Sequence, residues 1–191
     1  MQRSRTASLL RAALVAALIA ASALITVPLG PVPVTLQVLA IAVAALVLSP
    51  AEAFASVALY LVLGAFGAPV FSGGGAGFGV VVGPTGGFLL GFLAGTPAAA
   101  LVRRALTRGG IRSVVLADSA SVIVLLAITY SAGLVQFAAV TGRDTAEAFA
   151  LAVAPFVLID LGKAAVAMAV ARGVRSAGLG DREPVVQPQV C

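Results

Sequence analysis

The sequence predicts an all-α, polytopic integral membrane protein with about six transmembrane helices. Three observations lead to this fold class: the composition, the succession of apolar segments and the placement of the arginines. Of the 191 residues, 61% are hydrophobic and only 10% are charged, whereas soluble domains carry roughly 25% charged residues. The mean hydropathy is +1.13. A transmembrane helix needs ~20 apolar residues, so the chain has room for about six spans and for no additional soluble domain.

Turn-forming residues divide the chain into apolar segments. We expect spans at residues 8–27, 34–48, 51–66, 83–102, 114–137 and 148–171. The first ends at Pro28, the second at Ser49 and the third near Gly67, whereas Pro84 suits the first turn of the fourth. Together these spans form one predicted domain, residues 1–175. The polar tail, residues 176–191, is expected to be disordered and cytoplasmic.

The basic residues collect before the first span, between the fourth and fifth spans, and after the last. They are Arg3, Arg5 and Arg11, then Arg103, Arg104, Arg108 and Arg112, and finally Arg172, Arg175 and Arg182. Even numbers of spans separate these places, so they share one side of the membrane, and the positive-inside rule makes that side cytoplasmic. We therefore expect both termini in the cytoplasm. Nucleic-acid binding is the weaker interpretation, because no aromatic residues interleave with the arginines.

The N-terminus also has features of a secretory signal, since its arginines and apolar run are followed by Ala21-Ser22-Ala23. Five further apolar segments favour a retained span instead. The three loops that would face outward are 28–34, 69–82 and 138–147, and the first two are rich in glycine and proline. Irregular backbone at membrane depth is tolerated where it is buried in protein or lines a cavity. A substrate pocket at the external face would explain that composition.

Lys163, the only lysine, lies with Asp160 inside the last apolar stretch. A charge at that depth costs at least ~2.5 kcal/mol and usually faces a partner, a cavity or a ligand. Residues three apart share one helix face, so the pair marks an interior site. It could be a mutual ion pair that stabilises the bundle, a ligand contact, or both. Asp118, near the cytoplasmic end of the fifth span, is expected to pair with Arg112 or another nearby arginine.

Other polar and small residues suggest narrower roles. Predicted pocket-lining positions near the external ends are Thr35, Gln37, Thr85 and Tyr130. Glycines at 83, 87, 91 and 95 form a stripe that favours close helix packing. Alanines at 12, 16 and 20, with a second row at 13, 17 and 21, could pack internally or dock a separate membrane subunit.

Several function classes are excluded or disfavoured. The glycine run at 73–79 lacks the Gly-Lys-Ser/Thr of a P-loop, so the chain does not hydrolyse ATP itself. Histidine is absent and Cys191 is the only cysteine, which excludes cysteine-based zinc motifs and disulfides. No nucleophile–base motif is present. We expect no enzymatic activity, no cofactor and no metal.

Four segments in this order together resemble one family. They read PVPVTLQ at 31–37, LGAFGAPVF at 63–71 with its glycine-rich continuation, GPTGGFLLGF at 83–92, and PFVLIDLGK at 155–163. The chain resembles BioY, the biotin-binding S component of bacterial energy-coupling-factor (ECF) transporters, over roughly residues 9–172.

This resemblance implies a six-helix subunit of the bacterial inner (plasma) membrane that captures biotin from outside. It would work with a transmembrane coupling subunit and two ABC-type ATPases, and tilt to deliver its ligand inward. Family members carry alanine-spaced small residues on the first helix at the contact with the coupling subunit. That favours docking at Ala12, Ala16 and Ala20.

The resemblance also places Asp160 and Lys163 in the biotin pocket. We expect Asp160 to accept from a ureido N–H and Lys163 to donate to a ligand oxygen, while Phe71, Phe78 and Phe88 enclose the apolar part. The glycine loop, including Gly75 and Gly77, would bind the carboxylate through backbone N–H groups. Phe88 stands where many relatives are expected to have tyrosine, and the motif at Asp160 reads IDLGK rather than GDLLK.

Three rival functions remain at this point. The chain could be an S component for another vitamin such as thiamine or riboflavin, although these ligands favour more aromatic stacking than 6% aromatic residues and no tryptophan provide. It could be a structural membrane protein whose charges only hold the bundle together. An intramembrane enzyme would need an unfamiliar arrangement of residues.

Overall fold

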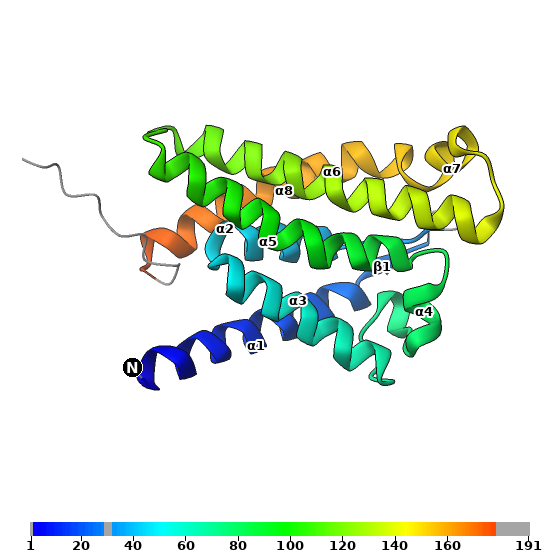
Figure 1. Cartoon of the computed structure of the whole chain (residues 1–191), viewed down its shortest axis with the longest axis horizontal. Helices are drawn as coiled ribbons and strands as arrows, with labels where there is room; N and C mark the ends of the chain where they lie inside the picture. The colour runs from blue at the N-terminus through cyan, green and yellow to red at the C-terminus, as the bar shows by residue number, and fades with distance from the viewer. Residues whose placement is uncertain (1, 29–31, 179–191) are drawn as a thin grey trace, which may run out of the picture.

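The structure is a computed structural model that describes residues 2–28 and 32–178. Most of the predicted disordered tail, residues 179–191, lies outside the described residues. The elements in order are α1 (Gln2–Leu24), β1 (Thr26–Val27), β2 (Val34–Thr35), α2 (Gln37–Val47), α3 (Pro50–Ala65), the 3-10 turn η1 (Ser72–Gly74), α4 (Phe78–Val82), α5 (Gly86–Arg108), α6 (Val114–Thr141), α7 (Thr145–Ala152) and α8 (Ala154–Ser176). Figure 1 shows the long helices running side by side along the molecule.

The predicted fold class is confirmed: the chain is an all-helical membrane bundle. Among the described helices, α1, α5, α6 and α8 are long and apolar enough to cross a membrane, whereas α2 and α3 are shorter apolar helices. With 1.5 Å of rise per residue, the 11 residues of α2 span about 16 Å. That is roughly half of the hydrocarbon thickness. The six predicted spans are therefore four long helices and two short ones.

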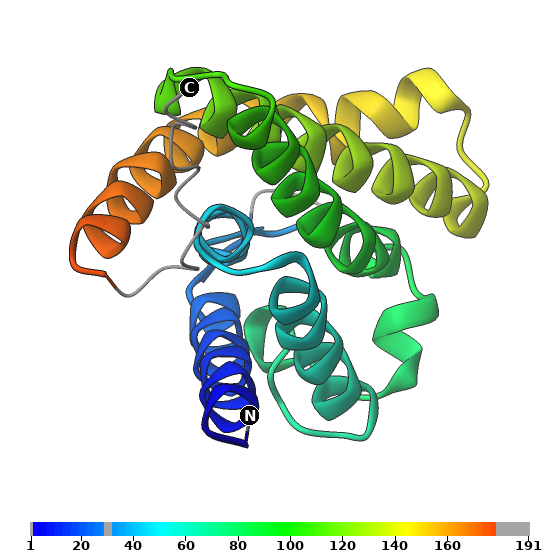
Figure 2. The same cartoon turned by 60° about the vertical axis from the view of Figure 1, so that its left-hand side comes forward.

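Helix α2 forms the centre of the bundle. It is apolar on every side and buries eight of its eleven residues, from Gln37 to Val47. A helix that is hydrophobic all round belongs in a protein interior. Figure 2 shows this short helix nearly end-on, with the long helices arranged around it. The core contains Ile41 and Leu46 from this helix together with Ile19 of α1 and Leu125 of α6.

The start predicted for the last span, residue 148, is wrong. Two helices occupy this region: α7 ends at Ala152, and α8 begins at Ala154 after a non-helical Val153. Pro155 lies in the first turn of α8, where it is tolerated, but it cannot continue a helix from α7. Two further elements were not predicted: the short helix α4 inside the glycine-rich segment, and an antiparallel pair of strands in which Thr26 faces Thr35.

The glycine stripe on α5 permits close packing against α6, as predicted for three of its four members. A Cβ atom on Gly87 would lie 2.3 Å from the carbonyl oxygen of Ala132, and one on Gly91 would lie 2.7 Å from the Cα of Thr129. A Cβ atom on Gly95 would lie 3.2 Å from Leu125. Gly83 precedes α5 and faces its own preceding turn instead.

We expect Gly87→Ala to lower the free energy of unfolding by about 1–3 kcal/mol, the usual cost of overpacking. The added methyl group would meet the backbone of α6, which cannot rotate away as a side chain can. Thermal unfolding in detergent measures this loss. Gly173→Ala is the matched control, because its Cβ would meet nothing within 4 Å. A Gly87→Ala protein as stable as the control would contradict the packing described here.

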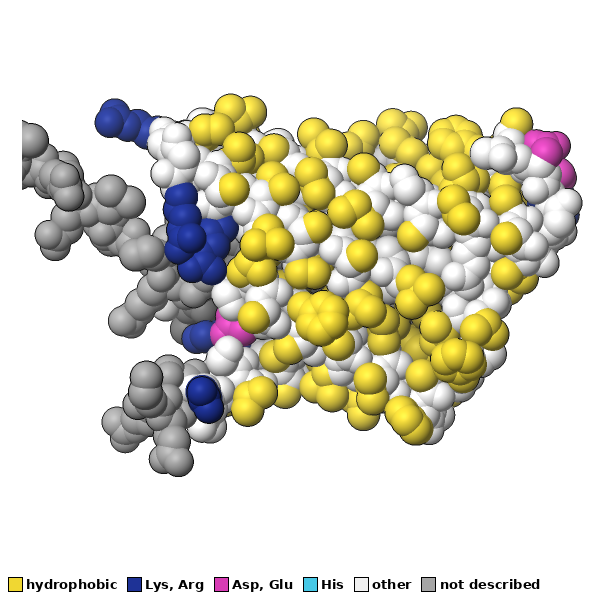
Figure 3. Space-filling view, in the orientation of Figure 1, with side chains coloured by type: hydrophobic (Ala, Val, Ile, Leu, Met, Phe, Trp, Pro, Cys, Tyr) yellow, Lys and Arg dark blue, Asp and Glu magenta, His cyan; other side chains and the backbone are white. Residues whose placement is uncertain are grey.

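The described arginine groups share one end of the bundle, as the sequence predicted. The N-terminus of α1, the α5–α6 turn and the C-terminus of α8 lie together at the left of Figure 1. Dark blue side chains gather at the same end in Figure 3, whereas apolar side chains cover the length of the visible face. This distribution fits a bundle embedded in lipid with one basic end.

Two buried carboxylates organise the basic end. Glu52 completes a capping box with Ser49 at the start of α3, and it also binds Ser8 and Arg11 of α1. Asp118 of α6 is fully buried and accepts from Arg103 Nε at 3.0 Å and from Arg175 Nη2 at 2.7 Å. Its partners are therefore Arg103 and a distant arginine on α8, and the exposed Arg112 is not among the partners described.

Candidate ligand-binding site

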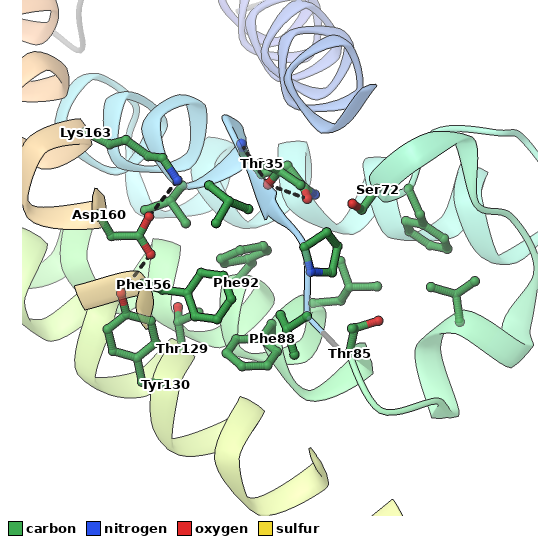
Figure 4. Close-up of a pocket in the computed structure, with 18 residues that line it drawn as sticks. Thr35, Ser72, Thr85, Phe88, Phe92, Thr129, Tyr130, Phe156, Asp160 and Lys163 are labelled. Atoms are coloured by element: carbon green, nitrogen blue, oxygen red, sulfur yellow. Dashed lines mark hydrogen bonds and ion pairs between the residues drawn. The ribbon is translucent and has the colours of Figure 1, made fainter. Parts of the chain in front are cut away.

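A cavity opens between the β-ribbon, α2, α5, α6 and α8 (Figure 4), towards the end of the bundle opposite to the three arginine groups (Figure 1). Its lining is polar at its two ends and apolar in between. The lining residues are Val32, Pro33, Val34, Thr35, Gln37, Val38, Phe71, Ser72, Val80, Thr85, Phe88, Leu89, Phe92, Thr129, Tyr130, Phe156, Asp160 and Lys163.

The first polar end is a buried charge cluster on α8 and α6. Lys163 Nζ donates to Asp160 Oδ1 at 2.7 Å, and the Tyr130 hydroxyl donates to Asp160 Oδ2 at 2.7 Å. Asp160 is 3% exposed and Lys163 is 9% exposed. Each oxygen of the carboxylate already has one donor and keeps capacity for another. Asp160 and Lys163 therefore form an ion pair with each other and also line the cavity.

Gln37 extends this polar surface from the N-terminus of α2. Its side-chain Nε2 donates to the Tyr60 hydroxyl at 2.7 Å, and its Oε1 accepts from Thr35 Oγ1 at 3.1 Å. Tyr60 itself is 1% exposed. These two contacts hold the amide group in place between α3 and the β-ribbon.

Aromatic rings form the middle of the cavity. Phe71 packs edge-on against Tyr60, with ring centroids 5.5 Å apart. Gly64 leaves room for this ring, since a Cβ there would lie 2.3 Å from it. Phe88 similarly lies over Gly133 of α6. Figure 4 shows Phe88, Phe92 and Phe156 between the charge cluster and Thr85.

The second polar end contains the hydroxyl groups of Ser72 and Thr85. Hydrogen bonds connect this end of the cavity to neighbouring segments of the chain. Thr26 Oγ1 lies 3.3 Å from Ser72 Oγ and accepts from the Gly73 N–H at 3.1 Å. On the other side, Gln136 Nε2 donates to the carbonyls of Val81 and Gly83 at 2.9 and 2.8 Å. These bonds connect β1 with η1, and α6 with α4 and the turn after it, at the mouth of the cavity.

Most sequence-predicted site residues line this cavity. They are Thr35, Gln37, Phe71, Thr85, Phe88, Tyr130, Asp160 and Lys163. Phe78 does not: it is 66% exposed on α4 and is not among the lining residues, so its contact with a ligand stays a prediction without support from this geometry. Gly75 and Gly77 are also absent from the lining.

The glycine-loop N–H groups that were expected to bind an anion make hydrogen bonds within the protein. The N–H of Gly74 donates to Phe71 O at 2.9 Å, and that of Gly75 donates to Ser72 O at 3.2 Å. Gly77 donates to Gly64 O at 2.7 Å, which attaches the loop to α3. These groups are already used inside the protein. The loop shapes the mouth of the cavity instead.

Sequence reasoning missed several lining residues, among them Ser72, Phe92, Thr129 and Phe156. Phe156 lies one helical turn before Asp160 and shares its face, so helical spacing alone could have identified it. Thr129 directly precedes Tyr130, but neighbours on a helix usually point apart. Its place in the cavity follows from the α5–α6 packing.

The predicted docking row on the first helix is mostly turned inward. Ala12 is 5% exposed and Ala16 is 3% exposed, because both pack against the bundle, and Ala20 is half-buried. The neighbouring row at positions 13, 17 and 21 is exposed. The outer surface of α1 is therefore formed by this second row together with exposed leucines such as Leu14 and Leu18.

Comparison with known proteins places these features in context. The profile of the BioY family matches residues 1–179. In three dimensions, the fold is similar to a crystal structure of the S-component for biotin from an ECF-type ABC transporter. The TM-score is 0.84, with 92% of this chain and 94% of that chain covered at 22% sequence identity.

Curated relatives are similar over different lengths. The chain is 52% identical over 93 residues to biotin transporter BioY2 of Lactococcus lactis, which covers 49% of this chain and about half (51%) of that relative. It is 40% identical over 159 residues to a probable biotin transporter BioY of Pyrococcus horikoshii, covering 83% of this chain and 90% of the relative. With biotin transporter BioY of Rhizobium etli it shares 34% identity over 175 residues, 88% and 93% of the two chains.

Proposed function

Since the chain belongs to the BioY family, we propose that it captures biotin as the S component of an ECF-type transporter. The single observation that carries the proposal within the structure is the Asp160–Lys163 pair at the end of an apolar cavity. Lysine occurs nowhere else in the sequence. The names of the relatives, several of them biotin transporters, support the same ligand.

The cavity suits the chemistry of biotin along its whole length. Biotin has a rigid ureido ring with N–H donors and a carbonyl, an apolar thiophane ring and a valerate chain with a carboxylate. In the proposed pose, the ureido ring lies against Asp160, which accepts from an N–H, and Lys163 donates to a ligand oxygen. The phenylalanine rings contact the thiophane and the chain, and the carboxylate lies towards Ser72 and Thr85.

The protein is a multi-pass membrane protein, and we propose that its arginine-bearing end faces the cytoplasm. Both termini then lie inside, and the cavity opens at the external end. Residues 1–175 act as one transmembrane domain. Transport needs a transmembrane coupling subunit and two ABC-type ATPases, because this chain carries no P-loop of its own. It binds and delivers its ligand without chemical change.

Isothermal titration of the purified wild-type protein in detergent tests the ligand. We expect saturable binding of biotin at one site, with thiamine and riboflavin giving no heat under the same conditions. Binding of thiamine or riboflavin in place of biotin would assign the protein to another vitamin. No heat with any of the three, from a monodisperse helical sample, would favour a bundle whose buried charges are structural.

A further inference from the structure

One hydroxyl group in the cavity has no partner. Among the described side chains with fully buried nitrogen or oxygen atoms, Thr129 Oγ1 is the one without a hydrogen bond. Thr129 is 1% exposed and lines the cavity. Buried polar groups are nearly always hydrogen-bonded, so an unpaired one inside a ligand cavity indicates a bond that forms when the ligand is present.

Other hydroxyl groups in these helices donate a hydrogen bond to a backbone carbonyl of their own helix, and Thr129 does not. Thr96 donates to Phe92 O at 2.6 Å, and Ser121 donates to Ala117 O at 2.7 Å. Thr141 bonds in the same way to Phe137 O. Serine and threonine within a helix commonly bond to the carbonyl one turn back. The hydroxyl of Thr129 does not form this bond, although it lies in the same kind of helix.

The backbone of Thr129 is held rigidly. Gly91 of α5 lies so close that a Cβ there would be 2.7 Å from the Thr129 Cα. Figure 4 shows the residue beside Tyr130 and close to Phe156, on the same side of the cavity as Asp160. The hydroxyl is therefore fixed next to the charge cluster. Preorganised polar groups of this kind confer affinity and specificity with little ordering on binding.

We infer that Thr129 is a specificity-determining residue whose hydroxyl hydrogen-bonds the ureido ring of the ligand. The inference rests on the proposed function and adds a contact to it. A threonine hydroxyl donates and accepts, so it can complement the ureido carbonyl or an N–H beside the bonds made by Asp160 and Lys163. A ligand of the same shape without polar atoms at this end leaves the hydroxyl unpaired and binds less well.

Two variants separate the hydroxyl from the shape of the side chain. Thr129→Val keeps the branched shape and removes the hydroxyl, and Thr129→Ser keeps the hydroxyl and removes a methyl group. We expect Thr129→Val to weaken biotin binding about tenfold with a melting temperature, measured without ligand, at or above that of the wild type. Thr129→Ser should bind within about threefold of the wild type. Thr96→Val, which removes a buried hydroxyl bonded within its own helix, is the matched control and should keep wild-type affinity.

Titration with desthiobiotin, which keeps the ureido ring and lacks the sulfur, separates a contact with the ureido ring from a contact with the sulfur. The loss caused by Thr129→Val should be the same for both ligands. A loss seen with biotin alone would assign the hydroxyl to the sulfur and overturn the ureido contact. Wild-type affinity in Thr129→Val, or an equal loss in Thr129→Ser, would overturn the inference while leaving the proposed function intact. No biotin binding by the wild type would overturn both.

Discussion

Replacing Asp160 by asparagine and Lys163 by methionine together is expected to weaken biotin binding by roughly a hundredfold or more. Truncating buried, hydrogen-bonded charges at a binding site costs about 2–5 kcal/mol, and each 1.4 kcal/mol is a factor of about ten. Both side chains are nearly inaccessible to solvent and line the cavity. Titration calorimetry with biotin measures the loss.

The double variant is preferable to either single change. Removing one partner leaves the other charge buried and uncompensated, which destabilises a protein by about 3–5 kcal/mol. Exchange of both for neutral groups of similar size is often neutral. Asparagine at 160 can still accept from the Tyr130 hydroxyl, which bonds the carboxylate here. The double variant should therefore fold, and its lost affinity would report on the ligand contact.

A second ion pair provides the matched control. Arg143, in the turn before α7, is paired with Glu147 of α7, at the same end of the bundle but exposed to solvent. The double change Arg143→Met and Glu147→Gln should leave both biotin affinity and melting temperature nearly unchanged, because exposed ion pairs contribute about 0–1 kcal/mol. Retained binding in a folded Asp160/Lys163 double variant would show that the buried pair is structural.

Hydropathy and turn residues predicted most of the helices, because an apolar span in lipid must satisfy its backbone polar groups with hydrogen bonds of its own, which a helix provides. The break before α8 could also have been predicted. Asp144 caps α7 by accepting from the Glu147 N–H, and Pro155 begins a new helix. A single long apolar run concealed these signals. The β-ribbon, with two residues in each strand, is too short to leave a periodic pattern.

The candidate site was predictable where chemistry is unusual and not where it depends on packing. Asp160 and Lys163 are conspicuous because charges are rare inside membranes. Phe78 was predicted to enclose the apolar part of the ligand because it is an aromatic residue in the glycine-rich segment. In the structure, it is exposed on α4. Thr129 became a candidate only when the structure showed that its hydroxyl lacked a partner. Such a role depends on neighbours that spacing along the chain does not reveal.

The second large effect is expected at Asp118, the buried aspartate at the arginine-bearing end. Asp118→Asn should lower the free energy of unfolding by about 3 kcal/mol, because it leaves two guanidinium groups close together without their counter-charge. Arg103 and Arg175 are 14% and 18% exposed, so water at the membrane surface offsets part of the cost. Thermal unfolding in detergent measures the change.

The network around Asp118 connects four helices, which explains why a small substitution should have a large effect. Arg175 of α8 binds Asp118 of α6 and also donates to the Leu46 carbonyl at the end of α2 at 3.0 Å, while Arg103 adds α5. Replacing all three charged residues by apolar ones, Asp118→Leu with Arg103→Met and Arg175→Met, should restore part of the lost stability. A triple variant no more stable than Asp118→Asn would show that the hydrogen bonds, rather than the unbalanced charges, dominate.

Substitutions at the two buried aspartates should therefore have different effects, one on stability and the other on biotin affinity. Asp118 lies at the arginine-bearing end and Asp160 at the cavity, so the folded fraction of Asp118→Asn should bind biotin with wild-type affinity. The Asp160/Lys163 double variant should show the reverse, an almost unchanged melting temperature and little affinity. Weakened biotin binding in a folded Asp118→Asn protein would mean that the basic end and the cavity are coupled through α6 and α8.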